Sequence, residues 1–494
     1  MASQLNGQDS KLSPAAQRRK DHHEGDVVIV GAGVLGCALA VALGNQGRSV
    51  ILLEKSLEEP NRIVGELLQP GGVQALEQLG LRDCLENIDG IDVKGYWVSY
   101  FGEPVLLEYP KSSPNSPTPL GRAFHHGRFV MKLRAAALAC PNVTVIETKV
   151  TGLVTSPETQ EVLGVECLTK EVKDCYFGSL TVAADGYNSE FRKQYHEYAP
   201  KRRSKFYGLE LIDADLPAPN TGHVLINDNP PVLMYQIGTH ETRILIDIPD
   251  NLPLASVKNG GVKGYMQKCI LPRLPEGAQK SFSDALEKGQ LRSMPNSFLP
   301  ASVNKTPGLM ILGDALNMRH PLTGGGMTVA LNDVCLIREL LSPEAVPHLS
   351  NTGLVLEQLA EFHWRRKKSS SVINILAQAL YALFAADGTF FLLFGYFHIA
   401  NSFSADQSLK ALQRGCFRYF QIGPVSGPVG LLAGLIKQPL VLVSHFFSVA
   451  FLAIWMVFRD TPLTHILLFP YYAFMILYTA CVVILPYIWT EIWY

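Results

Sequence analysis

The sequence predicts an α/β protein that ends in membrane-anchoring α-helices, and three observations support this fold class. β-Branched runs alternate with helical stretches and Gly/Pro turns from residue 26 to about residue 342, a pattern typical of α/β domains. A glycine-rich strand–turn–helix opens that region. Beyond residue 437 the chain is almost entirely apolar, and long apolar runs indicate helices that meet lipid.

The composition excludes several classes of protein. Of the 494 residues, 47% are hydrophobic and 18% are charged, so the chain as a whole is not intrinsically disordered. The 43 Lys and Arg residues nearly balance the 44 Asp and Glu residues, which leaves no basic surface for nucleic acid. The nine cysteines include no C-x-x-C pair. This spacing favours a reducing compartment, and we predict neither disulfides nor a metal site.

We expect four consecutive segments. The first is polar, lacks the apolar core of a signal peptide, and is predicted to be a disordered leader. The second is an α/β region, to which the family resemblance given below assigns a cofactor domain with an interleaved substrate domain of β-sheet. The third is a helical segment at the substrate entrance, and the fourth is a hydrophobic helical anchor. Their predicted ranges are 1–25, 26–342 (with the substrate part at roughly 90–130 and 200–300), 343–436 and 437–494.

The glycine-rich segment has the features of a dinucleotide-binding βαβ unit. In the run from Asp26, Gly31 permits a tight turn, Gly33 lets the backbone approach a pyrophosphate, and Gly36 allows close helix packing. A second strand ends at Glu54, 23 residues after Gly31, where a carboxylate can accept ribose hydroxyls. A purely structural glycine turn is the alternative, but the flanking strands and the terminal acid favour the dinucleotide site.

The backbone after the turn adds a phosphate site. The N–H groups of Val34 and Leu35 fall at the predicted helix N-terminus, where partial positive charge attracts phosphate. This unit by itself does not distinguish FAD from NAD(P).

Two further strand ends help to distinguish FAD from NAD(P) as the cofactor. A strand from Leu180 ends in Asp185-Gly186, and another from Gly308 ends in Gly313-Asp314. Their order and spacing resemble the flavin-dependent monooxygenases with the aromatic-hydroxylase fold. The resemblance implies a Rossmann-like FAD-binding domain, with Asp314 beside the ribityl chain and pyrophosphate. It also implies that the segment from Pro321 to Met327 brings backbone amides to the isoalloxazine ring.

Longer strings resemble one family in that class, the squalene monooxygenases or squalene epoxidases. They run from Arg62 to Gly72, Phe124 to Phe129, Leu291 to Pro300, Asn317 to Met327 and Asn374 to Tyr381. The resemblance extends from about residue 26 to the C-terminus. No apolar segment precedes the glycine turn, as in fungal-type members. The resemblance implies that the protein epoxidises squalene to (S)-2,3-oxidosqualene with O2, a step of sterol (ergosterol) biosynthesis.

The resemblance also implies particular site residues. Tyr96 matches a tyrosine that is important for activity in the family and that approaches Gln69, so we take this pair as catalytic. The family's FAD contacts carry over to Val34, Leu35, Glu54, Lys55, Arg62, Leu67, Arg134, Val150, Asp314 and Met327.

The apolar tail predicts attachment to a membrane. Residues 440–458 and 461–490 carry no formal charge, and each run reaches the length of about 20 residues that crosses a hydrocarbon core. Pro470, Pro486 and two histidines interrupt the runs, so a hairpin that dips into one leaflet stands beside two full spans. A buried helix pair is a third alternative, although neither run has a polar face.

The segment from residue 371 to residue 400 is also apolar. It is predicted to form two short helices joined at Asp387-Gly388, with Asn374, Gln378 and Tyr381 on one helix face. We expect it to line the entrance from the lipid.

The remaining expectations concern electrons, location and rival functions. The sequence shows no second dinucleotide motif after a strand, so NADPH acts either by transient binding or through a membrane-bound NADPH–cytochrome reductase. The resemblance implies the endoplasmic reticulum membrane with the catalytic domain facing the cytosol, and lipid droplets as a second location. A phenol hydroxylase or prenyl-lipid reductase on the same fold, and a membrane scaffold that retains FAD, are the alternatives.

Overall fold

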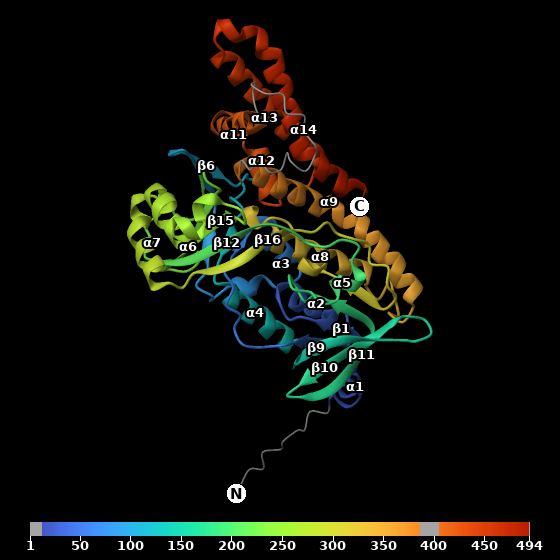
Figure 1. Cartoon of the computed structure of the whole chain (residues 1–494). Coiled ribbons are helices and arrows are strands. Elements are labelled where there is room, and N and C mark those ends of the chain that lie inside the picture. Colours follow the sequence, from blue (N-terminus) through green and yellow to red (C-terminus); the bar gives the residue numbers. More distant parts are fainter. Residues whose placement is uncertain (1–11, 386–404, 494) are drawn as a thin grey trace.

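The computed structural model describes residues 12–385 and 405–493. It shows an α/β body from which three C-terminal helices rise at one end, with α1 (Pro14–His22) at the opposite end (Figure 1). These three helices are α11 (Ala405–Ile422), α13 (Pro439–Asp460) and α14 (Phe469–Trp493). The predicted α/β class with apolar C-terminal helices is confirmed.

Seven strands form the first sheet: β1 (Glu24–Val30), β2 (Val50–Glu54), β8 (Val143–Glu147), β9 (Lys149–Thr155), β10 (Val162–Thr169), β11 (Val172–Ala183) and β17 (Leu309–Ile311). Their order is β8-β2-β1-β11-β10-β9, with β17 also paired to β11. The strands β8, β2, β1, β11 and β17 run parallel, and β10 pairs antiparallel with both β11 and β9. Parallel strands share one carboxyl edge, so the three predicted strand-end motifs meet there.

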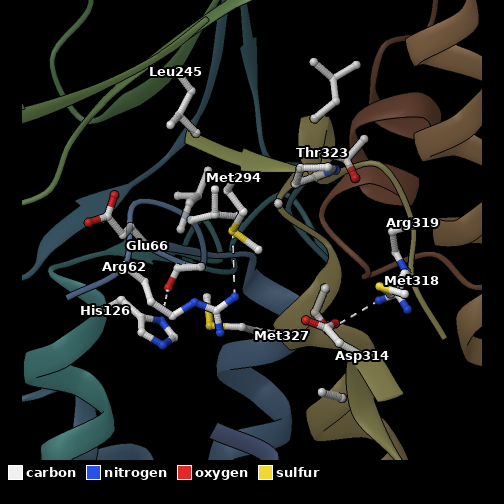
Figure 2. A pocket seen from close by; sticks show the side chains of 18 of the residues that line it. Arg62, Glu66, His126, Leu245, Met294, Asp314, Met318, Arg319, Thr323 and Met327 are labelled. Carbon is white, nitrogen blue, oxygen red and sulfur yellow. Dashed lines mark hydrogen bonds between the residues drawn. The ribbon is translucent and has the colours of Figure 1, made fainter. Parts of the chain in front are cut away.

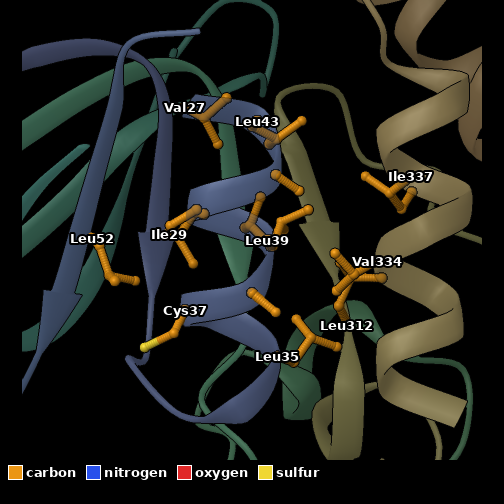
Figure 3. Close-up of a cluster of buried hydrophobic side chains, with 14 of the residues drawn as sticks. Val27, Ile29, Leu35, Cys37, Leu39, Leu43, Leu52, Leu312, Val334 and Ile337 are labelled. Carbon is orange, nitrogen blue, oxygen red and sulfur yellow. The ribbon is translucent and has the colours of Figure 1, made fainter. Parts of the chain in front are cut away.

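The core of this domain surrounds α2 (Val34–Asn45), which packs between the first sheet and α8 (Gly326–Leu340) (Figure 3). Because α2 is covered on both sides, it is apolar on all its faces, and nearly all of its residues are buried. The helix α3 (Pro70–Gln78) packs against α8, and α4 (His126–Ala139) packs against α2.

Seven other strands form the second sheet: β5 (Gly95–Tyr100), β6 (Glu103–Glu108), β12 (Lys201–Ile212), β13 (Thr221–Ile226), β14 (Val232–Gln236), β15 (Glu241–Pro249) and β16 (Arg292–Phe298). Their order is β16-β12-β15-β14-β13-β5-β6, antiparallel except for β13 and β5. The helix α7 (Glu276–Lys288) packs against β12. Most strands of this sheet come from one stretch of the chain, and β5 and β6 add an earlier hairpin.

A small sheet and several further helices complete the part of the chain that the structure describes. A three-stranded sheet joins β3 (Leu67–Leu68), β7 (Gly121–Ala123) and β4 (Ile91–Val93). The remaining helices of more than three residues are η1 (Arg82–Leu85), α5 (Arg192–Tyr195), α6 (Gly261–Tyr265), η4 (Met266–Ile270), α9 (Thr352–Ala385), α12 (Ser426–Leu432) and η8 (Leu463–Leu468).

A buried ion pair ties the second sheet to the segment that precedes β3. Arg243 on β15 donates to both carboxylate oxygens of Glu66, at 2.7 and 3.0 Å, and both side chains are almost fully buried. The two hydrogen bonds fix the position of the second sheet relative to the segment before β3 at this point.

We expect Arg243→Ala to lower the free energy of unfolding by about 3–5 kcal/mol, because Glu66 would remain buried without its partner. Arg202→Ala is the matched control, since Arg202 on β12 pairs with Asp250 at the exposed surface and should cost less than about 1 kcal/mol. Denaturant titration in detergent compares the two variants. Equal losses would show that the Glu66 pair has no special role.

The prediction that residues 1–25 are disordered is wrong for the helix α1. Ser13 caps this helix through the Ala16 N–H, and the buried Arg19 anchors it to the body. The Arg19 guanidinium donates to Thr144 Oγ1 at 2.8 Å, Ser49 Oγ at 2.9 Å and the Pro141 carbonyl at 3.0 Å. These partners come from distant positions, so local composition does not reveal them. Residues 1–11 lie outside the described residues.

The first of the two short helices predicted after residue 371 is part of a longer helix in the structure. Residues 371–385 are the end of the single helix α9, which runs for 34 residues because no glycine or proline follows Gly353 within it. The predicted joint at Asp387-Gly388 lies outside the described residues.

The hairpin of α13 and α14 contains two helices long and apolar enough to cross a membrane, with mean hydropathy values of 2.3 and 2.0. Only 17% and 22% of their most apolar windows are buried against protein. Both ends of the hairpin contact the body. Just before α13, the Ala433 carbonyl accepts the Gly71 N–H at 2.9 Å, and at the end of α14 Glu491 accepts from Asn374 at 2.9 Å.

Candidate active site

A cavity lies between the carboxyl edge of the first sheet and the second sheet (Figure 2). It receives residues from the start of α2, from the segment before β3, from the end of β17 and from the start of α8. Among the predicted site residues, those that line it are Gly33, Val34, Leu35, Arg62, Leu67, Tyr96, Asp314 and Met327.

The glycine turn is built as the sequence predicts. Gly31 has a φ of +105°, and a Cβ there would lie 2.5 Å from the Ala184 carbonyl oxygen of the neighbouring strand end. A Cβ on Gly36 would collide with the Gly31 carbonyl oxygen. By contrast, no atom lies within 4 Å of a Cβ on Gly33, so the chain leaves open space there. Two glycines therefore shape the turn, and the third leaves room for a ligand.

The donors around that space fit FAD. No side chain caps α2, so the N–H groups of its first turn are available to a pyrophosphate. Across the cavity, Gly313 has a φ of +66° and places the Asp314 carboxylate where cofactor hydroxyls can donate to it. Arg62 lines the same space, and its Nη2 lies 3.8 Å from Met294 Sδ. Backbone amides, a carboxylate and a cation are the groups that a dinucleotide requires.

Other predicted contacts lie behind the turn. The Glu54 carboxylate accepts the Ala32 N–H at 2.8 Å, and the Arg134 guanidinium donates to the Ala32 carbonyl at 3.0 Å and to the Glu58 carbonyl at 2.9 Å. Arg134 Nη2 lies 3.7 Å from Glu54 Oε2. In this arrangement Arg134 supports the backbone of the turn.

Two further predicted residues, together with Gly31 and Gly36 of the turn, also lie outside the cavity lining. Lys55 is exposed after β2, and Val150 is half-buried on β9. These positions remain predictions for FAD contact.

The predicted pair of Tyr96 and Gln69 is brought together in a buried network. The Tyr96 hydroxyl donates to Gln69 Oε1 at 2.8 Å, and the Tyr109 hydroxyl donates to the same oxygen at 2.7 Å. Gln69 Nε2 donates to the Thr323 carbonyl at 2.9 Å. Burial raises the pKa of Tyr96 and of Tyr109, so both remain protonated donors at neutral pH.

Sequence reasoning missed Tyr109, because nothing in its local pattern distinguishes it from a core tyrosine. It also assigned no role to His126, which lines the cavity within a string that we singled out. His126 Nδ1 lies 2.9 Å from the Gly65 carbonyl. Burial lowers the pKa of His126 to about 4, so the ring is neutral at pH 7 and donates Nδ1–H to that carbonyl.

The half of the cavity toward the second sheet is mostly apolar. The side chains here come from the strands β13 to β16, from the segment before β3 and from the segment before α8. The apolar members are Val64, Val224, Leu233, Leu245, Met294 and Leu322. A lining of this kind suits a hydrocarbon beside the cofactor.

Solved structures share this fold. A p-nitrophenol 4-monooxygenase from Pseudomonas putida matches with a TM-score of 0.61 and 16% identity, over 86% of this chain and 98% of that one. A geranylgeranyl bacteriochlorophyll reductase-like protein from Thermoplasma acidophilum matches with a TM-score of 0.61 and 19% identity, over 86% and 99%. A family model for an FAD binding domain matches residues 24–95. Fold and site together define an FAD-dependent flavoprotein.

Sequence relatives narrow the class. The family model described as squalene epoxidase matches residues 177–394 and 396–469. Squalene epoxidase erg1 of Aspergillus fumigatus is 65% identical, over 99% of this chain and 98% of the relative. Squalene monooxygenase of Mus musculus is 43% identical, over 95% of this chain and 78% of the relative. The chain belongs to the squalene epoxidase family.

Proposed function

We propose that this protein epoxidises squalene to (S)-2,3-oxidosqualene in sterol biosynthesis. The reaction consumes squalene, O2, two electrons and two protons. One oxygen atom enters the epoxide and the other leaves as water. The observation that carries the proposal is the apolar half-cavity joined to the FAD-binding half, in a chain of this family.

When bound, FAD supplies the activation of O2. The chain holds the cofactor through the N-terminus of α2, Arg62 and Asp314, which line the cavity. The segment that carries Thr323 and Gly324 closes the cavity wall beside them, and Gly324 has a φ of +63°. A glycine there keeps the main chain free of a side chain where the ring and the substrate must approach.

Squalene offers no hydrogen-bonding group, so the chain recognises it through buried apolar area. Each Å2 removed from water contributes about 25 cal/mol. The leucine, valine and methionine side chains of the cavity provide that surface and exclude water from the reacting atoms.

Tyr96, Tyr109 and Gln69 fix the polar wall of the cavity. Two hydroxyls donate to Gln69 Oε1, so its amide nitrogen must point to the Thr323 carbonyl. This arrangement orients the 321–327 segment against the cofactor. No proton transfer is assigned to Tyr96, because its hydroxyl is held protonated by burial.

Electrons come from NADPH, and a membrane-bound NADPH–cytochrome reductase is the proposed donor. The family resemblance supports this donor. We find no second dinucleotide motif after a strand, and transient binding of NADPH is the alternative route. The reductase would deliver electrons to FAD from the cytosolic side.

The proposed location is the endoplasmic reticulum membrane, with lipid droplets as a second site. Both ends of the α13–α14 hairpin contact the catalytic body, which supports a single face of entry into the lipid. A cytosolic body on that face can take squalene directly from the membrane.

Labelled oxygen tests the reaction. The purified protein in detergent, with reductase, NADPH, squalene and 18O2, should yield oxidosqualene that carries one 18O atom by mass spectrometry. A prenyl-lipid reductase would give an unlabelled, hydrogenated product. A protein that forms only hydrogen peroxide would overturn the proposal.

Membrane attachment through the hairpin is tested with exposed residues at its turn, because truncation would also uncover the α9 contacts. Leu463 and Leu467 are 88% and 90% exposed. Together they contribute about 3 kcal/mol if they enter lipid, so Leu463→Glu with Leu467→Glu should lower the vesicle partition coefficient at least about 100-fold. Val257→Glu is the control, since Val257 is an exposed apolar residue of the body at 93%. An unchanged coefficient for the double variant would place the lipid contact elsewhere.

A further inference from the structure

A buried arginine at the cavity wall has no role in the site described so far. Arg319 lies between the Asp314 motif and α8, and it lines the same cavity as Asp314 and Met327 (Figure 2). Arg319 is only 9% exposed. A guanidinium that is removed from water requires either a counter-charge or a full set of acceptors.

The protein satisfies Arg319 incompletely. Its Nη2 donates to the carbonyl and the Oδ1 of Asn317 at 2.8 and 2.7 Å, and its Nη1 makes a long 3.5 Å contact with the Gly326 carbonyl. Its buried Nε has no hydrogen-bond partner among the described residues. All of these acceptors are neutral, and no carboxylate within residues 12–385 and 405–493 forms an ion pair with Arg319.

Three carboxylates attract Arg319, which are Asp314 most strongly, then Asp333 and Glu491. None of them forms an ion pair with it among the described residues, and Asp333 is already paired with another arginine. Asp333 on α8 receives two hydrogen bonds from Arg366, at 3.0 and 2.9 Å, in a bidentate pair. Asp333 is therefore not free to neutralise Arg319. Burial lowers the pKa of Arg319 by more than the nearby carboxylates raise it, so its surroundings disfavour the charge.

A chain of amides extends from Arg319 to the membrane hairpin. Asn317 Oδ1 also accepts from Asn374 Nδ2 at 3.1 Å, and the same Nδ2 donates to Glu491 Oε1 at 2.9 Å. Glu491 is buried near the end of α14. The last turn of the apolar hairpin thus holds Asn374, which positions the Asn317 amide together with Arg366 and the Leu299 carbonyl.

We propose that the Arg319 guanidinium binds an anionic part of FAD, which is either the pyrophosphate or the reduced ring. Glu491 is a positioning residue that holds Arg319 through Asn374 and Asn317. The inference rests on the proposed function only in taking FAD as the cofactor. The proposal links the position of the α13–α14 hairpin to FAD binding. If α14 moves away from the body, Glu491 no longer holds Asn374 and Asn317 next to Arg319.

The test is a fluorescence titration of the apoprotein with FAD, without squalene. Arg319→Gln should raise the dissociation constant of FAD at least about tenfold, and Arg319→Lys should restore part of the affinity because it keeps the charge. Arg365→Gln is the matched control, since Arg365 on α9 pairs with Glu339 at the surface. It should leave FAD binding unchanged.

Glu491→Gln tests the positioning role, because glutamine keeps the shape and removes the charge. It should raise the dissociation constant about threefold while circular dichroism stays unchanged. A merely structural role for Glu491 would lower the unfolding temperature and leave FAD affinity as it was. If Arg319→Gln does not fold, Arg319→Lys and Glu491→Gln decide the question.

The reduction potential of the holoenzyme separates the two anions. If Arg319 binds the pyrophosphate, affinity falls equally for both redox states and the potential stays constant. If it faces the reduced ring, the potential becomes more negative by about 30 mV for each tenfold preference lost. Wild-type affinity and potential in Arg319→Gln would overturn the inference, while failure of epoxidation alone would overturn only the proposed reaction.

Discussion

Replacing Asp314 with alanine is expected to raise the dissociation constant of FAD by about 100-fold, so that the purified variant is nearly colourless. The Asp314 carboxylate faces the cavity at the end of β17. Hydrogen bonds to a charged group contribute about 1.5–3 kcal/mol each, and two such bonds from cofactor hydroxyls account for the loss. Absorbance of bound flavin after gel filtration, followed by titration of the apoprotein, measures it.

Two controls distinguish this role from a general loss of structure. Asp314→Asn keeps the shape of the side chain and should lose less affinity than alanine. Asp174→Ala removes a carboxylate near the start of β11, at the other end of that strand from the cavity, and should keep its FAD. Normal flavin content in Asp314→Ala would remove the assigned role.

The second large effect is expected for Tyr96→Phe, which should retain FAD and lower kcat by about 10- to 100-fold. Phenylalanine keeps the ring but leaves Gln69 Oε1 with a single donor, Tyr109, in a buried site. An unmet partner there costs about 1–3 kcal/mol, and each 1.4 kcal/mol is a tenfold change in rate. Single-turnover assays with bound FAD measured separately check the result.

Tyr265→Phe is the matched control, because the buried Tyr265 hydroxyl makes no hydrogen bond with any described residue. Its turnover should equal that of the unmodified protein. Tyr109→Phe shares the acceptor with Tyr96, so the double variant should lose less than the two single losses combined. A normal rate in Tyr96→Phe would show that Gln69 keeps its orientation without this hydroxyl.

Local patterns were sufficient to predict the glycine turn and the sheet edge where the cavity lies. Gly31, Gly33 and Gly36 predicted the turn at the correct residues, and the parallel sheet brought Asp314 to the same edge. These features follow from backbone geometry, because a tight turn needs glycine and parallel strands end together.

Contacts between distant segments of the chain could not be predicted from local sequence patterns. The sequence predicts Arg134 as a cofactor contact, and only the structure shows that Arg134 also donates to the Ala32 and Glu58 carbonyls. The leader was expected to be disordered, but Arg19 finds acceptors from residues 49, 141 and 144. Each outcome depends on which groups the folded chain places nearby, and a local window of sequence does not contain those groups.

The sequence by itself determined the family, the FAD-binding turn and the apolar hairpin, because each is encoded by a run of neighbouring residues with a fixed period or spacing. Only the tertiary structure decided that Tyr109 shares Gln69 with Tyr96, and that the far end of the hairpin returns Glu491 to the polar network around Arg319. Such contacts depend on how whole helices and sheets pack. A carboxylate or hydroxyl is buried only where a hydrogen-bond partner from another part of the chain lies beside it.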